Sequence, residues 1–155
     1  MSSSRRKAPR KCKLDEFARL IKLEMGKLFR EAQGEVELSA DILDYYADNA
    51  ERFLAPEKLE VAEGEAFLEN EPLGVLFCIE PWNFPYYQLA RVVGPNLMAG
   101  NTLVVKHAPN VPQCALAFEK LFLDAGAETA AGRGGHCANS SQVSRGGGAA
   151  GEARR

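Results

Sequence analysis

Two short polar segments, residues 80–83 and 106–109, carry side chains that could bind or polarise a ligand. Asn83 offers an amide donor in a loop braced by prolines, which suits the stabilisation of an oxyanion at a fixed position. Lys106 offers a flexible cation, which suits ribose hydroxyls or a phosphate. Each also has a simpler interpretation, because an Asn in a loop commonly makes a local hydrogen bond and a Lys at a strand end commonly extends into solvent. Residue type alone favours these simpler interpretations.

The histidines and cysteines give weaker signals. His107 has no Ser or Cys at a spacing that suggests a catalytic dyad, so we expect it to be exposed to solvent. Cys78 lies inside an apolar run and is expected to be a small buried hydrophobic residue. The four cysteines have no CxxC spacing, which predicts free thiols with neither a zinc site nor a disulfide framework. Neither polar segment belongs to a GxGxxG fingerprint or a Walker-type loop.

The overall charge of −2 at pH 7 gives no reason to expect nucleic acid or an anionic membrane as a partner. Basic residues gather in residues 5–13, before the first acidic residue, and predict a disordered arm over residues 1–13. An organelle-targeting peptide is the alternative, although the arm is short and has no apolar face. No apolar run is long enough to cross a bilayer, so we expect a cytoplasmic protein.

Two amphipathic helices are expected to precede the polar segments. Apolar residues recur at steps of three and four over residues 14–28, and again over residues 36–54, where Pro56 marks the end. Isolated helices of this length are marginal in water, so each must pack its apolar stripe against another surface. A helical hairpin is the simplest arrangement.

The elements that position the two polar segments alternate between strand and helix. Continuous apolar runs at residues 75–79 and 102–106 are typical of parallel strands buried on both faces, while residues 86–98 and 112–126 have helical spacing. We expect a kink at Pro95, and Asn110 is expected to open the last helix. This β-α-β-α order predicts the start of a Rossmann-like parallel sheet, in which ligands bind outside the carboxyl ends of the strands.

The character of the sequence changes after Gly126. Residues 127–155 are rich in Gly, Ala and Arg, and such a composition predicts a disordered tail. Two strands are fewer than such a sheet normally has. We therefore expect self-association through an unpaired sheet edge. The residues expected on or near this edge are Val75, Phe77, Ile79, Val104 and Val105.

Several short motifs follow one another between residues 14 and 126. They are Leu23-Glu24-Met25-Gly26-Lys27, Gly34-Glu35-Val36, Pro72-Leu73-Gly74-Val75, Pro81-Trp82-Asn83-Phe84-Pro85, Gly94-Pro95, Ala99-Gly100-Asn101-Thr102 and Val104-Val105-Lys106. Any one of them would be a weak signal, but the ordered series is specific. In this order they resemble the early motifs of NAD(P)-dependent aldehyde dehydrogenases, and of the succinate-semialdehyde branch in particular.

The resemblance implies a nicotinamide cofactor and a role for the residues around both polar segments. Asn83 would donate its amide to the oxyanion of a thiohemiacetal, and Lys106 would bind the adenosine ribose. Ile79, Pro81 and Trp82 would line the cofactor site.

Three further positions bear on specificity. The family often has Glu three residues after the lysine in NAD-preferring members. Here the residue is Pro109, which leaves room for a 2′-phosphate and favours NADP over NAD. Phe84 would flank the aldehyde tunnel. Arg91 could pair with the distal carboxylate of succinate semialdehyde, and a surface helix Arg is an equal alternative.

The family's glutamate base and cysteine nucleophile are not recognisable after Gly126. We therefore expect an inactive fragment that binds the cofactor weakly, with residues 14–126 forming a partial cofactor domain and residues 127–155 arising from a frameshift or a faulty gene model. The alternative is a non-catalytic module that binds nucleotide or associates with complete subunits. The resemblance implies that the intact members of the family act on a small aldehyde.

Overall fold

The structure is a computed structural model that describes residues 7–127 and 137–139, with side chains from residue 13 to residue 127. The chain runs through four helices and five strands within these residues. In order they are α1 (Lys7–Met25), α2 (Phe29–Leu54), β1 (Glu57–Leu59), β2 (Ala66–Leu68), β3 (Val75–Glu80), α3 (Pro85–Met98), β4 (Thr102–His107), α4 (Pro112–Asp124) and β5 (Cys137–Asn139).

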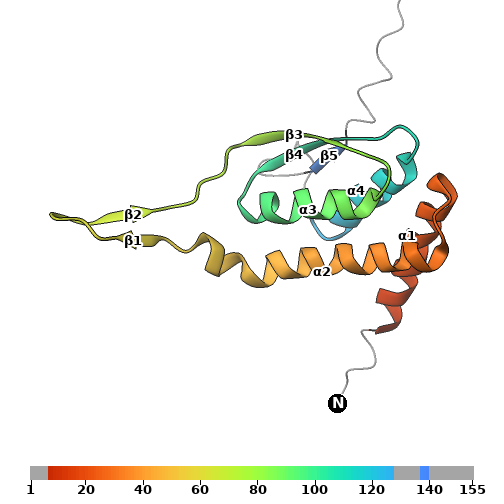
Figure 1. Ribbon diagram of the computed structural model, residues 1–155, viewed down its shortest axis with the longest axis horizontal. Coiled ribbons are helices and arrows are strands. Elements are labelled where there is room, and N and C mark those ends of the chain that lie inside the picture. Colours follow the sequence, from red (N-terminus) through yellow and green to blue (C-terminus); the bar gives the residue numbers. More distant parts are fainter. Residues whose placement is uncertain (1–6, 128–136, 140–155) are drawn as a thin grey trace, which may run out of the picture.

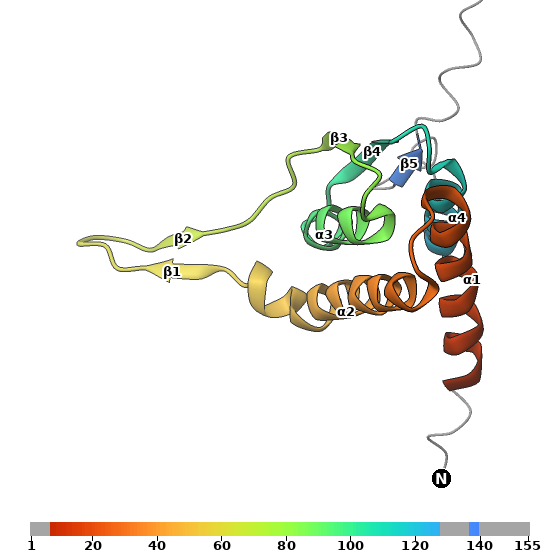
Figure 2. The same cartoon turned by 45° about the vertical axis from the view of Figure 1, so that its right-hand side comes forward.

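The elements stack in three layers (Figure 1). The parallel sheet lies on top, α3 and α4 lie beneath it, and α2 runs under α3. Figure 2 shows α1 crossing the end of α2 and standing beside α4, and α1 packs against both. The antiparallel β1–β2 hairpin projects away from this body. The predicted helical hairpin and β-α-β-α order are thus confirmed.

Among the described residues, helices cover one face of the sheet only. Leu103 and Val105 of β4 are buried beneath it, against α3 and α4. The alternate positions of β3 face the other way, and Val75, Phe77 and Ile79 are 61% to 70% exposed. The prediction of burial on both faces is therefore wrong for β3. Val104 and Val105 do not lie on an unpaired edge as expected, because β4 pairs with both β3 and β5.

Local sequence signals missed some elements. The expected disorder of residues 1–13 is wrong from Lys7 onward, where α1 begins. Within the expected disordered tail, Cys137–Asn139 forms β5 and pairs in parallel with β4, so the described sheet has three strands. The hairpin strand β1 was not expected. α3 continues through Pro95 as one helix. No helix in the described part of the chain combines the length and apolar composition needed to span a membrane.

Aromatic side chains hold the helical layers together. The Tyr86 ring is buried between α1 and α4, with its centroid 4.9 Å from that of Phe17 and 6.2 Å from that of Phe118. α2 and α3 approach closely at Gly94, where an added Cβ would meet the Tyr46 ring at 2.7 Å. A larger side chain at Gly94 would force the two helices apart.

A carboxylate from the helical hairpin caps α4. The sequence suggested Asn110 for this role, but α4 begins after Val111 and has no side-chain cap from its own N-terminal residues. Instead, the two oxygens of Glu24 accept the backbone N–H groups of Gln113 at 2.7 Å and Cys114 at 2.9 Å. These N–H groups have no partner inside the helix, and the positive end of the helix dipole favours the carboxylate.

We predict that Glu24→Gln lowers the free energy of unfolding by about 1–2 kcal/mol, because it removes the charge from a helix cap. Chemical denaturation measures the loss, and amide hydrogen exchange at Gln113 and Cys114 should accelerate more than exchange elsewhere. Glu16→Gln, at an exposed carboxylate on the same helix, is the control. Equal effects of the two substitutions would contradict the role of Glu24.

Candidate functional site

The two polar segments of the sequence lie side by side in the structure. β3 and β4 run in parallel, with Ile79 opposite Lys106 and Glu80 opposite His107. Both strands therefore end at the same edge, where ligands bind in open parallel sheets. The register confirms that the residues after β3 and the residues after β4 belong to one surface.

This edge presents an open surface with apolar side chains and one cation. Ile79 is 68% exposed and Trp82 is 52% exposed, while Pro81, Lys106 and Pro109 are also exposed. Apolar side chains beside a lysine suit an adenosine, since the base can lie against the former and the ribose or its phosphate can bind the latter. The described residues thus fit the adenosine end of a dinucleotide, but offer no Gly-rich cradle for its pyrophosphate.

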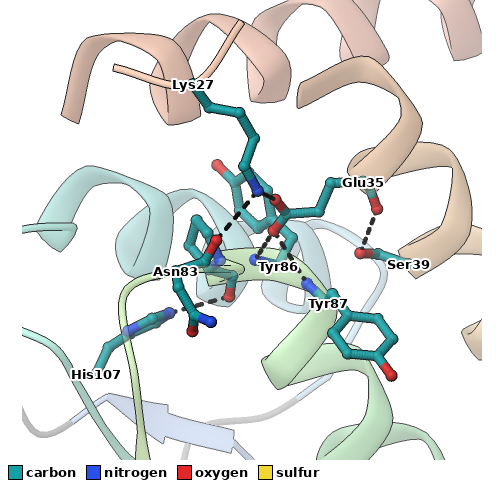
Figure 3. Close-up of polar contacts among 8 residues, drawn as sticks. Lys27, Glu35, Ser39, Asn83, Tyr86, Tyr87 and His107 are labelled. Carbon is teal, nitrogen blue, oxygen red and sulfur yellow. Dashed lines mark hydrogen bonds and ion pairs between the residues drawn. The ribbon is translucent and has the colours of Figure 1, made fainter. Parts of the chain in front are cut away.

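Asn83 lies in the loop between β3 and α3, and that loop is held from behind. The Lys27 ammonium donates to the backbone carbonyl of Asn83 at 3.1 Å (Figure 3). It also lies 3.8 Å from the centroid of the Phe84 ring. The Asn83 side chain is exposed, and its amide makes no hydrogen bond to any residue that the structure describes. Its N–H groups are therefore available to a ligand.

Glu35 of α2 caps α3. One of its carboxylate oxygens accepts the backbone N–H groups of Tyr86 at 2.9 Å and Tyr87 at 3.3 Å. The other oxygen forms an ion pair with Lys27. α3 has no side-chain cap from Phe84, so this carboxylate from a distant helix takes that role.

His107 closes the loop from the side of β4. The prediction that it is exposed is wrong, since it is only 8% exposed. Its Nδ1 accepts the backbone N–H of Ala108 at 2.8 Å, so its Nε2 carries the proton and donates to the carbonyl of Pro85 at 3.0 Å. Burial lowers the pKa of His107, outweighing the opposite effect of the hydrogen bond to Pro85. The ring is therefore neutral at pH 7.

Of the two predicted substrate residues, Phe84 immediately precedes α3 and Arg91 lies within it. Phe84 and Tyr87 have ring centroids 6.0 Å apart, and the Arg91 guanidinium lies 5.7 Å from the Tyr87 ring. Arg91 is exposed, and its contact with the Gln88 side chain is long at 3.5 Å. A guanidinium on this exposed row could meet an anionic ligand. Arg91 also borders a hollow of about 360 Å³, lined by Asp41, Ile42, Tyr45 and Tyr46.

No described thiol is prepared for nucleophilic attack. Cys78 and Cys114 are both free, as predicted, and burial raises the pKa of each. Burial likewise raises the pKa of Glu80 at the end of β3, and the charge of Arg91 partly opposes this. Cys12 and Cys137 lie outside the described side chains.

Comparison with known proteins decides the family. The sequence profile of the aldehyde dehydrogenase family matches residues 10–131. This chain belongs to the aldehyde dehydrogenase family. It is 56% identical over 112 residues to a succinate-semialdehyde dehydrogenase [NADP(+)] from Deinococcus radiodurans, a match that covers 72% of this chain and 24% of the relative. A probable succinate-semialdehyde dehydrogenase [NADP(+)] from Synechocystis is 47% identical over 112 residues, covering 72% of this chain and 25% of that protein.

Solved structures agree with the sequence comparisons. The crystal structure of succinic semialdehyde dehydrogenase from Streptococcus pyogenes, in complex with NADP+, superposes with a TM-score of 0.76 at 48% identity. The match covers 84% of this chain and 27% of the crystallised chain. The chain thus spans about a quarter of the length of the relatives it matches.

Three charged residues of this aldehyde dehydrogenase chain escaped interpretation from the sequence. Glu24, Lys27 and Glu35 fall in the first two family motifs, where no pattern of spacing indicated a role. Each acts on an element at least 51 positions away in the chain. Their position in a recurring motif was the only signal that could have found them.

We predict that stability falls as the pH decreases below about 6.5, because the unfolded chain then binds a proton on His107 that the folded chain does not. His107→Gln keeps a donor toward Pro85 and should reduce this slope, by up to about 1.4 kcal/mol per pH unit. Denaturation between pH 7.5 and 5.5 measures it. His136→Gln alters the other histidine and should leave the slope largely unchanged. A slope lost in His136→Gln and kept in His107→Gln would refute the assignment.

Proposed function

We propose that this chain supplies the adenosine-binding surface and the oxyanion donor of an NADP-dependent aldehyde oxidation. The observation that carries the proposal is the register of β3 and β4, which sets Ile79 beside Lys106 and leads directly into the loop of Asn83. Cofactor surface and hydrogen-bond donor are thereby adjacent on one sheet edge. In a dinucleotide held by its adenosine on this surface, the nicotinamide must reach the loop of Asn83 for hydride transfer from the aldehyde carbon to occur.

Asn83 is the proposed catalytic residue. Addition of a nucleophile to an aldehyde places negative charge on the carbonyl oxygen, and a fixed amide donor lowers the energy of that state. Two features support the role: its side-chain amide is exposed, and its backbone carbonyl is bound by Lys27. The nucleophile and the general base of the reaction are not among the residues that the structure describes.

NADP is the proposed cofactor, and when bound it accepts the hydride. Lys106 binds the ribose or its 2′-phosphate, while Ile79, Pro81 and Trp82 line the site. Pro109 places no carboxylate beside the 2′ position, which removes the feature that would repel the phosphate. The names of the two curated relatives described above, which specify NADP(+), support this choice. We expect weak binding, since the pyrophosphate lacks donors in the described residues.

The proposed substrate is a small aldehyde with a distal carboxylate, such as succinate semialdehyde. Phe84 flanks its path, and Arg91 pairs with the carboxylate. Support comes from the row of contacts from Phe84, just before α3, through Tyr87 to Arg91, and from the substrate that the names of the relatives print.

A second candidate function is association with other subunits. Apolar side chains on the open face of β3 and on the β1–β2 hairpin are exposed, and such surfaces commonly pair with another chain. They include Phe67, Leu68, Val75 and Phe77. Sedimentation of the chain tests this second candidate, because a chain that stays monomeric would contradict it. A monomer that also has no affinity for nucleotide would contradict both candidates.

We predict that NADP+ quenches the fluorescence of Trp82, which is the single tryptophan of the chain and lies in the proposed site. Lys106→Met should weaken the affinity about five- to tenfold, because a charge-assisted hydrogen bond is lost. Lys120→Met, on α4 in an exposed ion pair with Asp124, is the control and should bind normally. Absence of quenching, or equal binding by wild type and Lys106→Met, would contradict the proposed site.

A further inference from the structure

The segment that joins α1 to α2 touches the loop of the proposed oxyanion donor, and no step of the reaction accounts for this contact. We propose that Lys27 and Glu35 are positioning residues that fix Asn83 from behind the loop. The inference rests on the role proposed above for Asn83. It assigns a function to two charged residues that lie on the opposite side of the loop from the cofactor surface.

The backbone presents Lys27 toward the loop. α1 ends at Met25, and Gly26 follows with a positive φ of 73°, a conformation that residues with a Cβ rarely adopt. The turn sends the Lys27 side chain under residues 83–84, where it is only 10% exposed, and the Glu35 side chain beside it is 1% exposed. A charge so far removed from water must be paired, so the Lys27–Glu35 contact is obligatory for both groups.

The three hydrogens of the Lys27 ammonium match three partners. One partner is the Glu35 carboxylate, the second is the backbone carbonyl of Asn83 at 3.1 Å, and the third is the face of the Phe84 ring at 3.8 Å. The contact is thus made to the backbone of the donor residue itself. The carbonyl of Asn83 is turned toward Lys27, and its side chain extends away from Lys27, as Figure 3 shows.

Glu35 fixes the chain on the other side of the same loop. Its carboxylate accepts the N–H groups of Tyr86 and Tyr87. His107 donates to the carbonyl of Pro85, the residue before Tyr86. The backbone is therefore anchored at residues 83, 85, 86 and 87 by side chains from α2, β4 and the α1–α2 connection. Positions set in advance cost no reorganisation when charge develops on a substrate, which is the property an oxyanion donor needs.

NMR relaxation of the 155-residue chain tests the inference through the order of the backbone amides of Asn83 and Phe84. In the wild type we expect order parameters near 0.85, and in Lys27→Met values below about 0.6 at these two sites. Lys27→Arg keeps the charge and should restore most of the order. The matched control is Glu24→Gln, which removes the charge from the cap of α4 and should leave Asn83 ordered.

Nucleotide binding separates this inference from the proposed function. The Lys106 surface is intact in Lys27→Met, so NADP+ quenching of Trp82 should change less than about twofold while Asn83 loses order. Absence of quenching in the wild type would reject the cofactor site alone. Unchanged order of Asn83 in Lys27→Met would overturn the positioning role.

A second variant covers the case in which Lys27→Met does not fold. Glu35→Gln retains an oxygen for the N–H groups of Tyr86 and Tyr87 but removes the charge that holds Lys27. The order of Asn83 should fall while the amides of Tyr86 and Tyr87 stay protected from exchange. Loss of order that is equal at Asn83 and throughout α3 would contradict the inference, since it would show general loosening of the helix.

Discussion

The Glu35 carboxylate is the interaction on which the arrangement of the site depends. It is buried between α2 and α3, where an unpaired charge is not tolerated, and it satisfies this requirement with the N-terminal N–H groups of α3 and with Lys27. The start of α3, the course of residues 83–85 and the connection between α1 and α2 are thereby fixed relative to one another. The position of the loop that follows β3 therefore depends on the contacts of Glu35.

The helical hairpin has a corresponding role throughout the fold. Its first helix supplies Glu24 to the start of α4, and its second supplies Glu35 to the start of α3. Each helix that follows a strand of the parallel sheet is thus capped by a carboxylate from the hairpin. The helix dipole favours negative charge at a helix N-terminus. The same interaction therefore links the helical hairpin to the helices beneath the sheet at two places.

Local signals in the sequence were sufficient for the two strands β3 and β4, for the helices beside them and for the order of these elements. Apolar runs located β3 and β4, helical spacing located the helices, and the parallel arrangement brought Ile79 and Lys106 to one edge. Contacts between distant residues could not be obtained in this way. The burial of His107 depends on a carbonyl 22 positions away, and the Lys27 contact with Asn83 spans 56 positions, so neither leaves a periodic pattern. β5 could not be predicted either, because it lies in a Gly-, Ala- and Arg-rich segment and its pairing with β4 is a contact between distant residues.

The central claim is that the edge formed by the ends of β3 and β4 is a nucleotide site. A competing location exists, because a cavity of about 730 Å³ lies among α1, α2 and α4, with Phe17, Val36 and Phe118 in its lining. Two-dimensional amide NMR during titration with NADP+ distinguishes the two directly. The account predicts shifts confined to residues 79–84 and 106–108, including the side-chain amide of Asn83. Shifts centred on residues 17, 36 and 118, with residues 79–84 unchanged, would contradict it.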